Sequence, residues 1–249
     1  MHAPTNTFVS FQNVIFMPVL EAIQLTKLYN HTTALNNLHL SINNSEIFCL
    51  LGQNGAGKTT TINIFLGFIE PTSGQATING IPVQANDNST KKFIAYIPEI
   101  VQLYGNLTGI ENLDLFSRLA GFVYSKTELA MFLQKAGLQS IAHTQRLSTY
   151  SKGMRQKVGI AIALAKNADV ILMDEPTSGL DPKATDEFTK ICKELAAAGK
   201  TILMATHDIF NAVNVGTRIG IMKNGALVHT VPASHITAGE LQQLYLETI

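Results

Sequence analysis

The sequence has few of the features that mark a secreted, disulfide-bonded or zinc-binding protein. Among its 249 residues there are two cysteines, Cys49 and Cys192. Neither has the spacing of a disulfide framework or of a zinc site. Cys49 lies in the apolar run 47–51, where a cysteine is expected to behave as a small core residue. The cysteine content therefore fits a reducing compartment.

Long hydrophobic runs and an early positive charge are also absent. A transmembrane helix needs about 20 apolar residues in succession, whereas the apolar stretch 8–20 is shorter and is interrupted by Gln12 and Pro18. The first lysine or arginine is Lys27, so we find no positively charged beginning of a secretory signal. We therefore expect any link to a membrane to come through a partner.

Charge of either sign is scarce, and the two signs balance. Lysine plus arginine and aspartate plus glutamate each number 18, so the formal net charge is +0. A domain built to bind nucleic acid is usually basic overall, so this balance argues against nucleic acid as a partner. Hydrophobic residues make up 46% of the chain, which is enough for a sizeable core. The length suits one α/β domain.

Apolar strands alternate with helices along most of the chain, which indicates an α/β fold with a mainly parallel sheet. Asn224-Gly225 predicts a hairpin near the end. After Gly57 the pattern is helical to about Phe68. Other strands are expected to open at 17–20 and to lie within 34–51, at 170–173 and at 201–206.

Helical signals from about 108 to 167 interrupt this alternation. Thr108 and Ser125 each stand three residues before a glutamate, which is the spacing of a capping box. We interpret this block as a helical subdomain inserted into the α/β core. A later helix is expected to begin after Asp181, with Pro182 at its first position and Gly199 just beyond its end.

The strongest functional motif is Gly-Gln-Asn-Gly-Ala-Gly-Lys-Thr at 52–59, which matches a phosphate-binding P-loop. An apolar strand precedes it and a helical pattern follows it, as the motif requires. The glycines let backbone N–H groups point at a phosphate, and the helix adds its positive N-terminal end. We expect Lys58 to reach the β- and γ-phosphates of a nucleotide and the Thr59 hydroxyl to hold Mg²⁺.

Two carboxylates and a histidine follow the later strands. Asp174 and Glu175 come after the apolar run 170–173, and His207 comes after 201–206. Ligands of open α/β sheets bind at the carboxyl ends of the strands, so these groups should lie beside the P-loop. There Asp174 can contact Mg²⁺, Glu175 can accept a proton from an attacking water, and His207 can contact the γ-phosphate.

Together with Ser151-Lys152-Gly153-Met154-Arg155-Gln156, these motifs resemble the nucleotide-binding domain of ABC ATPases over about residues 19–232. The resemblance implies a P-loop NTPase (RecA-like) core with an antiparallel β subdomain and an inserted α-helical subdomain. It implies an ATPase domain at 17–232, with the helical subdomain at about 99–157, and a short C-terminal segment at 233–249. We expect residues 1–16 to be an extension outside the fold, with Met17 as a candidate start.

The resemblance also implies roles for single residues. Residues 52–60 correspond to the Walker A motif, 178–181 to the D-loop, and Asp174 to the Walker B aspartate. Tyr29 falls where the family stacks an aromatic ring on adenine, and an ordinary tyrosine at a strand end is the alternative. The implied catalytic residues are Glu175, His207 and Lys58. The implied contacts to ATP are Tyr29, Gly52, Asn54, Gly55, Gly57, Lys58, Thr59, Thr60, Ser151, Gly153 and Asp181.

The signature motif departs from the family pattern. Residues 150–154 read Tyr-Ser-Lys-Gly-Met, where the family usually has Leu-Ser-Gly-Gly-Gln. Ser151 and Gly153 are retained, and a hydroxyl with bare N–H groups at a helix start forms an anion site. Plain N-capping by Ser151 is compatible with this role.

A second departure is Glu99, which stands where the family usually has a glutamine beside the Mg²⁺ site. Glutamate still offers an oxygen ligand, so the expected metal ligands are Thr59, Glu99 and Asp174. An alternative register makes Gln102 the functional residue instead.

By resemblance, the chain is a subunit that binds and hydrolyses ATP and closes on a second ATP-binding subunit, with a homodimer expected. Residues 94–113 and 150–155 are similar to exporter-type subunits for drugs, lipids or polysaccharides. That similarity implies a multi-pass membrane permease as partner and a cytoplasmic position on the inner face of the cell membrane. Residues 100–120 are the expected docking face, with the candidates Ile100, Val101, Leu103, Tyr104 and Leu107; for each of them singly, packing within the helical subdomain is the favoured alternative.

Three other functions remain as alternatives. A soluble ABC ATPase that serves an iron–sulfur assembly scaffold shares every nucleotide motif and differs in its partner. An ABC protein that acts on DNA or ribosomes usually carries a long coiled coil or a second ATPase domain. A nucleotide-binding regulator without turnover is disfavoured by Glu175.

Overall fold

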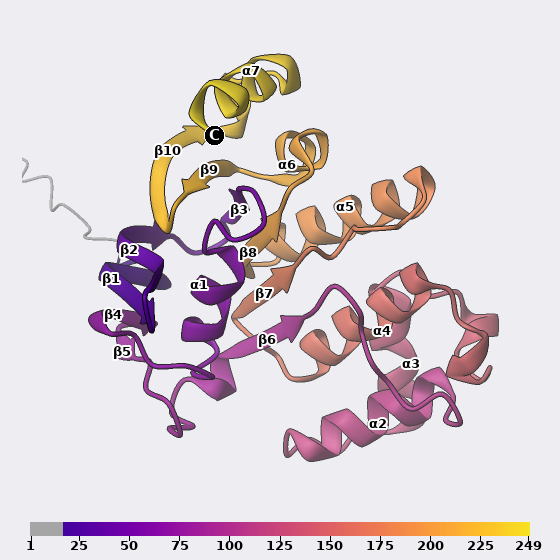
Figure 1. Ribbon diagram of the computed structural model, residues 1–249. Coiled ribbons are helices and arrows are strands. Elements are labelled where there is room, and N and C mark those ends of the chain that lie inside the picture. Colours follow the sequence, from indigo (N-terminus) through magenta and orange to yellow (C-terminus); the bar gives the residue numbers. More distant parts are fainter. Residues whose placement is uncertain (1–16) are drawn as a thin grey trace, which may run out of the picture.

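The computed structural model describes residues 17–249, and the expected extension 1–16 lies outside the described residues. The larger of two sheets has the strand order β10-β9-β3-β8-β7-β6 (Figure 1). Its strands are β3 (Ile47–Leu51), β6 (Ile94–Ile97), β7 (Val170–Asp174), β8 (Thr201–Thr206), β9 (Arg218–Lys223) and β10 (Ala226–Pro232). Neighbours are parallel except β9 and β10. The predicted, mainly parallel α/β sheet is confirmed.

The smaller sheet is antiparallel throughout, in the order β2-β1-β4-β5. Its strands are β1 (Leu20–Tyr29), β2 (Thr32–Ile42), β4 (Ser73–Ile78) and β5 (Ile81–Pro82). This is the antiparallel subdomain that the resemblance implied. It lies on the side of the larger sheet that carries α1 (Lys58–Phe65) (Figure 1).

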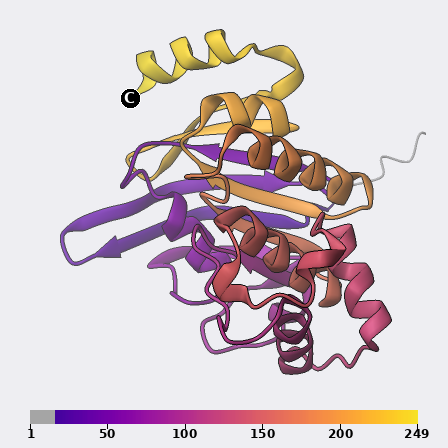
Figure 2. The same ribbon diagram turned by 90° about the vertical axis from the view of Figure 1, so that its right-hand side faces the viewer.

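The inserted helices α2 (Gly109–Leu119), α3 (Lys126–Lys135) and α4 (Lys152–Ala165) lie together beyond the ends of β6 and β7. The remaining helices are α5 (Pro182–Ala197), α6 (Ile209–Val215) and α7 (Ala238–Thr248). Both views place α7 at the end of the molecule opposite the inserted helices (Figures 1 and 2). The expected end of the helical subdomain, at about residue 157, falls inside α4. This helix therefore extends from the inserted subdomain toward the core sheet.

Local signals set most helix ends as the sequence predicts. Thr108 and Ser125 both form capping boxes, and Asp181 caps α5 by accepting a 2.9 Å hydrogen bond from the Ala184 N–H. The helix after the P-loop is shorter than expected: it ends at Phe65, and the sequence pattern predicted an end at about Phe68. Gly67 adopts a φ of 67°, and this left-handed turn stops the helix.

The core lies on both faces of the larger sheet, which explains the unbroken apolar runs of its strands. Alternate residues of β3 divide between the faces. Ile47, Cys49 and Leu51 pack with the inserted helices and α5, whereas Phe48 and Leu50 pack with α1 and the antiparallel sheet. Burial raises the pKa of the Cys49 thiol to about 12, as expected for a core cysteine.

The C-terminal hairpin forms as the sequence predicts. Asn224 and Gly225 both have positive φ, 50° and 78°, and they form the two-residue turn between β9 and β10. Within residues 17–249, every helix is too short or too polar to span a bilayer.

Candidate functional site

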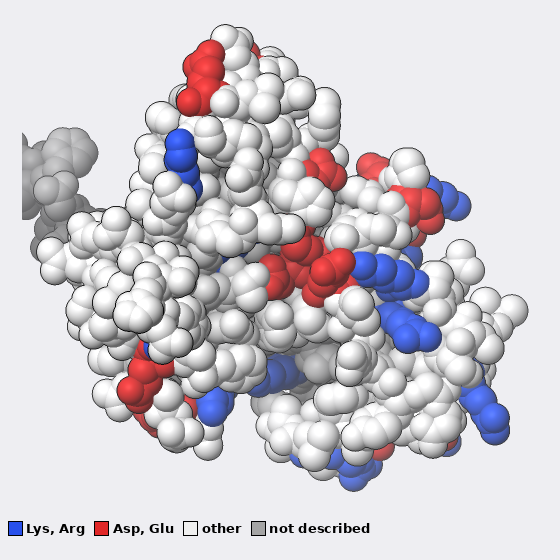
Figure 3. All heavy atoms as spheres, in the orientation of Figure 1, with Lys and Arg blue, Asp and Glu red and all other residues white. Residues whose placement is uncertain are grey.

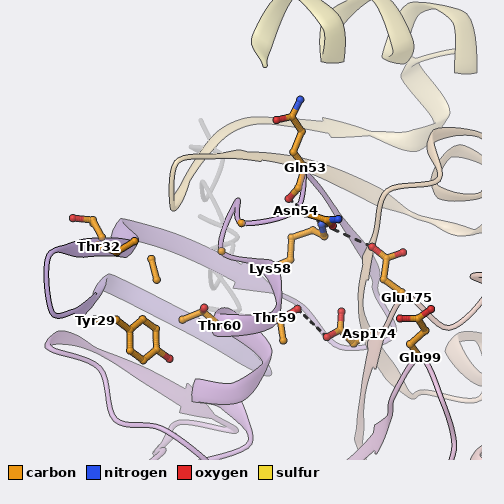
Figure 4. A pocket seen from close by; sticks show the side chains of 14 residues that line it. Tyr29, Thr32, Gln53, Asn54, Lys58, Thr59, Thr60, Glu99, Asp174 and Glu175 are labelled. Carbon is orange, nitrogen blue, oxygen red and sulfur yellow. Dashed lines mark hydrogen bonds and ion pairs between the residues drawn. The ribbon is translucent and has the colours of Figure 1, made fainter.

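A cavity of about 470 Å³ opens where the P-loop joins α1 (Figure 4). The loop follows β3 and wraps the first turn of the helix, so the helix N-terminus and its free N–H groups face the cavity. Gly57 has a φ of 109°, and a Cβ there would come within 2.7 Å of the Ala34 carbonyl oxygen. Only glycine fits this position, because the loop passes directly over the β2 backbone.

Most of the predicted site residues meet in this cavity. The predicted residues that line it are Tyr29, Asn54, Gly55, Gly57, Lys58, Thr59, Thr60, Glu99, Asp174 and Glu175. Gly52 takes part through its carbonyl, which accepts a 2.6 Å hydrogen bond from the Lys58 ammonium. The carboxyl ends of β3, β6 and β7 therefore converge as the strand rule predicts.

Lys58 is the buried cation of the site. Its side chain is 6% exposed, and its ammonium also donates to the Gln53 carbonyl at 3.3 Å and lies 3.8 Å from Glu175 Oε1. Burial lowers the pKa of Lys58, and the charges of Glu175 and Asp174 oppose that shift. A largely desolvated ammonium beside free N–H groups is suited to bind an anion such as a phosphate.

Thr59 and Asp174 are in direct contact, since the Thr59 hydroxyl donates to Asp174 Oδ2 at 2.9 Å. Burial raises the pKa of Asp174, the Thr59 hydrogen bond lowers it, and the nearby Glu175 charge raises it further. In the fold, the ionised form of this carboxylate is therefore disfavoured. A hydroxyl and a carboxylate are ligands that Mg²⁺ prefers, so this pair fits the ion.

No cluster of three or more His, Cys, Asp or Glu side chains suited to a metal occurs within residues 17–249. This finding is compatible with Mg²⁺, because Mg²⁺ in nucleotide sites takes one or two protein ligands and fills its octahedron with phosphates and waters.

Glu175 connects the buried lysine to His207. Oε1 of the carboxylate lies near Lys58, and Oε2 lies 2.9 Å from the ring atom Nδ1 of His207. The backbone N–H of His207 also donates to Oε2, at 3.3 Å. Glu175 has a φ of 46°, a left-handed conformation that is costly for a residue other than glycine. Such strain clusters at functional sites, and here it turns the carboxylate into the cavity.

Glu99 lies at the edge of the same cavity but already has partners. Ser178 donates to Glu99 Oε1 at 2.9 Å, and the Lys152 ammonium is 3.6 Å from the same oxygen. The amide of Gln156 donates to the Glu99 carbonyl at 3.0 Å. Gln102 is exposed and does not line the cavity, so the geometry favours the Glu99 register. Acidic side chains gather near the ends of β6 and β7, with basic side chains beside them (Figure 3).

Three predicted contacts to ATP lie outside this cavity. Ser151 caps α4 by accepting a 3.2 Å hydrogen bond from the Met154 N–H, and Asp181 caps α5. A Cβ on Gly153 would lie 3.4 Å from the Ala184 Cβ, so Gly153 faces the start of α5. A single chain thus places the P-loop and the signature motif in separate places.

Some cavity residues were not predicted. Gln53 lines it from within the P-loop, and Thr32, Thr33 and Ala34 line it from the β1–β2 hairpin. No local motif marks these three, because strand pairing alone brings them to the P-loop. Tyr29, at the end of β1, is half exposed, and the Lys27 ammonium lies 5.0 Å from its ring centroid. Lys27 thus makes a cation–π contact with this ring.

The expected docking candidates differ in exposure. Ile100 and Tyr104 are 61% and 54% exposed, whereas Val101 is 7% exposed. Val101 is therefore not a docking residue and follows the packing alternative, because it packs against Gly159 of α4 in the core. Leu103 and Leu107 are half-buried. An apolar groove of about 250 Å³ is lined by residues of β6 and α4, among them Ile94, Tyr96 and Ile162, together with Phe68.

Fold and site together define a P-loop nucleotide-binding ATPase with an inserted helical subdomain. Comparison with known proteins narrows the class. Residues 35–178 match the family described as ABC transporter. The chain therefore belongs to the ABC transporter family, as an ATP-binding subunit with ATPase activity.

Curated relatives support this assignment over nearly the whole chain. The bacitracin transport ATP-binding protein BcrA of Bacillus licheniformis is 34% identical over 220 residues, which cover 88% of this chain and 71% of that protein. The daunorubicin/doxorubicin resistance ATP-binding protein DrrA of Streptomyces peucetius is 32% identical over 225 residues, covering 90% of this chain and 66% of that protein.

Solved structures agree. The ATP-binding cassette MJ0796, solved as a dimer in a post-hydrolysis state with ADP and phosphate, matches with a TM-score of 0.77 and 29% identity. The match covers 86% of this chain and 98% of that one. Another ATP-binding subunit of an ABC transporter matches with a TM-score of 0.79 and 31% identity, covering 92% and 98% of the two chains.

Proposed function

We propose that this ATPase powers export through a separate multi-pass membrane permease, and that Glu175 is its general base. One observation supports the catalytic part above all. The Glu175 carboxylate lies between the Lys58 ammonium at 3.8 Å and His207 Nδ1 at 2.9 Å, beside the hydrogen-bonded pair Thr59 and Asp174. A base, a cation and a metal-binding pair thus lie around one cavity.

The proposed chemistry assigns a task to each group. Residues 52–60 hold the triphosphate through backbone N–H groups, and Lys58 neutralises its β- and γ-phosphates. Glu175 accepts a proton from the attacking water, and His207 fixes the carboxylate and reaches toward the γ-phosphate. Held by Thr59 and Asp174, with Glu99 close by, Mg²⁺ would neutralise charge that develops on the phosphates. Tyr29 offers its ring to the adenine.

A second ATP-binding subunit completes the site in this proposal. Ser151 and Gly153 begin a helix whose N–H groups can bind an anion, yet neither residue lines the cavity of its own chain. Asp181 is likewise outside it. The relative MJ0796 was solved as a dimer with ADP and phosphate. We therefore assign Ser151, Gly153 and Asp181 to the cavity of the partner in a C₂ homodimer.

The export role rests on the relatives. Their names assign bacitracin transport, daunorubicin/doxorubicin resistance and Nod factor export to those proteins. In the described chain, Ile100 and Tyr104 are large exposed apolar side chains on the segment before α2, and Phe68 and Tyr96 line an apolar groove beside α4. This surface suits a permease helix, which would hold the chain at the inner face of the membrane. The iron–sulfur scaffold alternative has no such support among these relatives.

Purification from solubilised membranes tests the proposal. The tagged wild-type chain should hydrolyse ATP and carry a multi-pass membrane protein with it. Lys58→Ala should lose ATPase activity but keep this partner, because Lys58 lies in the nucleotide cavity. Tyr104→Glu should lose the partner while its melting temperature stays within error of the wild type. Recovery of a soluble scaffold protein in place of a membrane protein would contradict the export role.

A further inference from the structure

A buried hydrogen-bond chain outside the nucleotide cavity connects three segments of the fold. The side chain of Asn211, in the first turn of α6, is 4% exposed. Its Nδ2 donates to Thr177 Oγ1 at 3.2 Å, and its Oδ1 accepts from Thr189 Oγ1 of α5 at 3.0 Å. Both threonines are buried as well. Burying an amide is unfavourable unless it is hydrogen-bonded, and here both polar ends of the amide have partners.

Two of these three residues lie close in sequence to the proposed catalytic pair. Thr177 is two residues after Glu175, and Asn211 is four residues after His207. The same two loops are therefore joined twice. The first contact is the Glu175–His207 pair, whose histidine is 62% exposed. The second contact is the buried hydrogen bond between Thr177 and Asn211.

Two further features bear on the spacing of these loops, besides the packing of α6 against α5. The sheet ladder holds them as far as the Glu175 N–H, which donates to the Ala205 carbonyl at 2.9 Å. Beyond that bond the loops diverge around a hollow of about 320 Å³, whose lining includes Glu175, Thr177 and His207. Packing does not act across a hollow, so the hydrogen bonds beside it help to set the distance between Glu175 and His207.

The backbone transmits the position of Asn211 to His207. The Asn211 N–H donates to Asp208 Oδ1 at 2.9 Å, and the Asp208 N–H donates to Thr206 Oγ1 at 3.1 Å. In the sequence, His207 lies between Thr206 and Asp208. A shift of Asn211 therefore moves the helix cap and, with it, the backbone of His207.

We propose that Thr177 and Asn211 form a positioning pair that sets the distance between Glu175 and His207 during hydrolysis. This inference rests on the roles proposed above for those two residues. A hydrogen bond suits the task better than an apolar contact, because it has a narrow range of distance and direction. Neither Thr177 nor Asn211 touches the nucleotide in this proposal, and both act through Glu175 and His207.

Isosteric substitutions test the pair. Thr177→Val keeps the shape of the side chain and removes the hydroxyl, and Asn211→Leu removes the amide. Each should lower kcat by about tenfold or more, since small misplacements of catalytic groups are costly. The KM for ATP and the affinity for a fluorescent ATP analogue should stay within about twofold, because residues 52–60 hold the nucleotide. Thr177→Ser, which restores the hydroxyl, should restore kcat.

Thr189→Val is the matched control. It removes one buried hydroxyl from the same Asn211 amide but leaves the bond to Thr177, so it should lower the melting temperature without lowering kcat. Hydrogen exchange at the His207 amide should be faster in Thr177→Val than in Thr189→Val. If the two variants lose kcat equally, or if Thr177→Val loses nucleotide affinity in proportion to kcat, the pair is merely structural and the inference is wrong.

A double mutant separates this inference from the proposed function. In a His207→Ala background, Thr177→Val should cause little further loss, because its target is already gone. If His207→Ala alone keeps the wild-type rate, the proposed role of His207 fails. If His207→Ala loses activity while Thr177→Val keeps it, or if the two losses multiply, the positioning role of Thr177 is overturned and the role of His207 stands.

Discussion

The Lys152 ammonium lies 3.6 Å from Glu99 Oε1, so two positions that depart from the usual ABC pattern carry opposite charges side by side. Lys152 stands where the signature motif usually has glycine, and Glu99 stands where glutamine is usual. Ser178 donates to the same carboxylate oxygen at 2.9 Å. The extra negative charge of Glu99, close to Asp174 and Glu175, thus has a local counter-charge.

We predict that the two departures compensate each other. Lys152→Gly should leave Glu99 unpaired and weaken the binding of an ATP analogue at low Mg²⁺, and adding Glu99→Gln should restore it. The effect should be modest, since an exposed ion pair contributes about 0–1 kcal/mol, and high salt should reduce it. Titration of each variant with a fluorescent analogue measures this. Equal affinities for the wild type and Lys152→Gly at low salt would contradict compensation.

The metal dependence should distinguish Glu99 from Gln102. A carboxylate beside a triphosphate is repelled unless Mg²⁺ lies between them, so the wild-type ATPase rate should rise more steeply with Mg²⁺ than the rate of Glu99→Gln. Glu99→Ala should lose substantial rate. Gln102→Ala should lose little, because Gln102 does not line the cavity. A silent Glu99→Ala with a damaging Gln102→Ala would mean that the register is wrong.

Asp174 should make the nucleotide-free protein less stable at neutral pH. Its pKa is raised in the fold, chiefly by burial, so the folded state favours the protonated form. The stabilising contribution is present at low pH and is lost as the pH rises through the raised pKa. Asp174→Asn should therefore raise the melting temperature in EDTA at pH 7.5, and by less at pH 4.5, while hydrolysis is lost. An unchanged or lower melting temperature at pH 7.5 would contradict this.

The N-terminal extension should be dispensable for the fold. Within the described residues, the hydrogen bonding of the antiparallel sheet already begins at Val19. Its N–H donates to the Ile42 carbonyl, and its carbonyl accepts from the Asn79 N–H, both at 2.8 Å. A chain that begins at Met17 should keep the melting temperature and ATPase rate of the full sequence. A clear loss of either quantity would show that Phe8, Phe11 or Ile15 packs on the core.

The sequence predicts the parts of the site that lie on local motifs. The P-loop, Glu175 and His207 each follow a buried strand, Asp174 ends one, and parallel strands bring their carboxyl ends to one edge. Thr32 to Ala34 reach the cavity through the pairing of β1 with β2, which no short pattern records. The Glu99–Lys152 contact joins residues far apart in the chain, so it emerges only after the helices pack.

The structure shows which of the candidate docking residues are exposed, which the sequence left open. Val101 and Ile100 are both apolar and adjacent, yet Val101 packs against α4 while Ile100 is exposed. The helix after the P-loop is also shorter than its apolar pattern suggested, because Gly67 turns the chain to the left-handed conformation. Periodicity reveals neither the contact of Val101 with α4 nor the turn at Gly67.

The central claim, that Glu175 is the base of an ATPase that closes as a dimer, is tested most directly by sizing Glu175→Gln with and without MgATP. The amide cannot accept the proton, so this variant should bind ATP, turn over at a small fraction of the wild-type rate and elute as a dimer only when ATP is present. A variant that stays monomeric in both conditions and hydrolyses ATP at the wild-type rate would contradict the account.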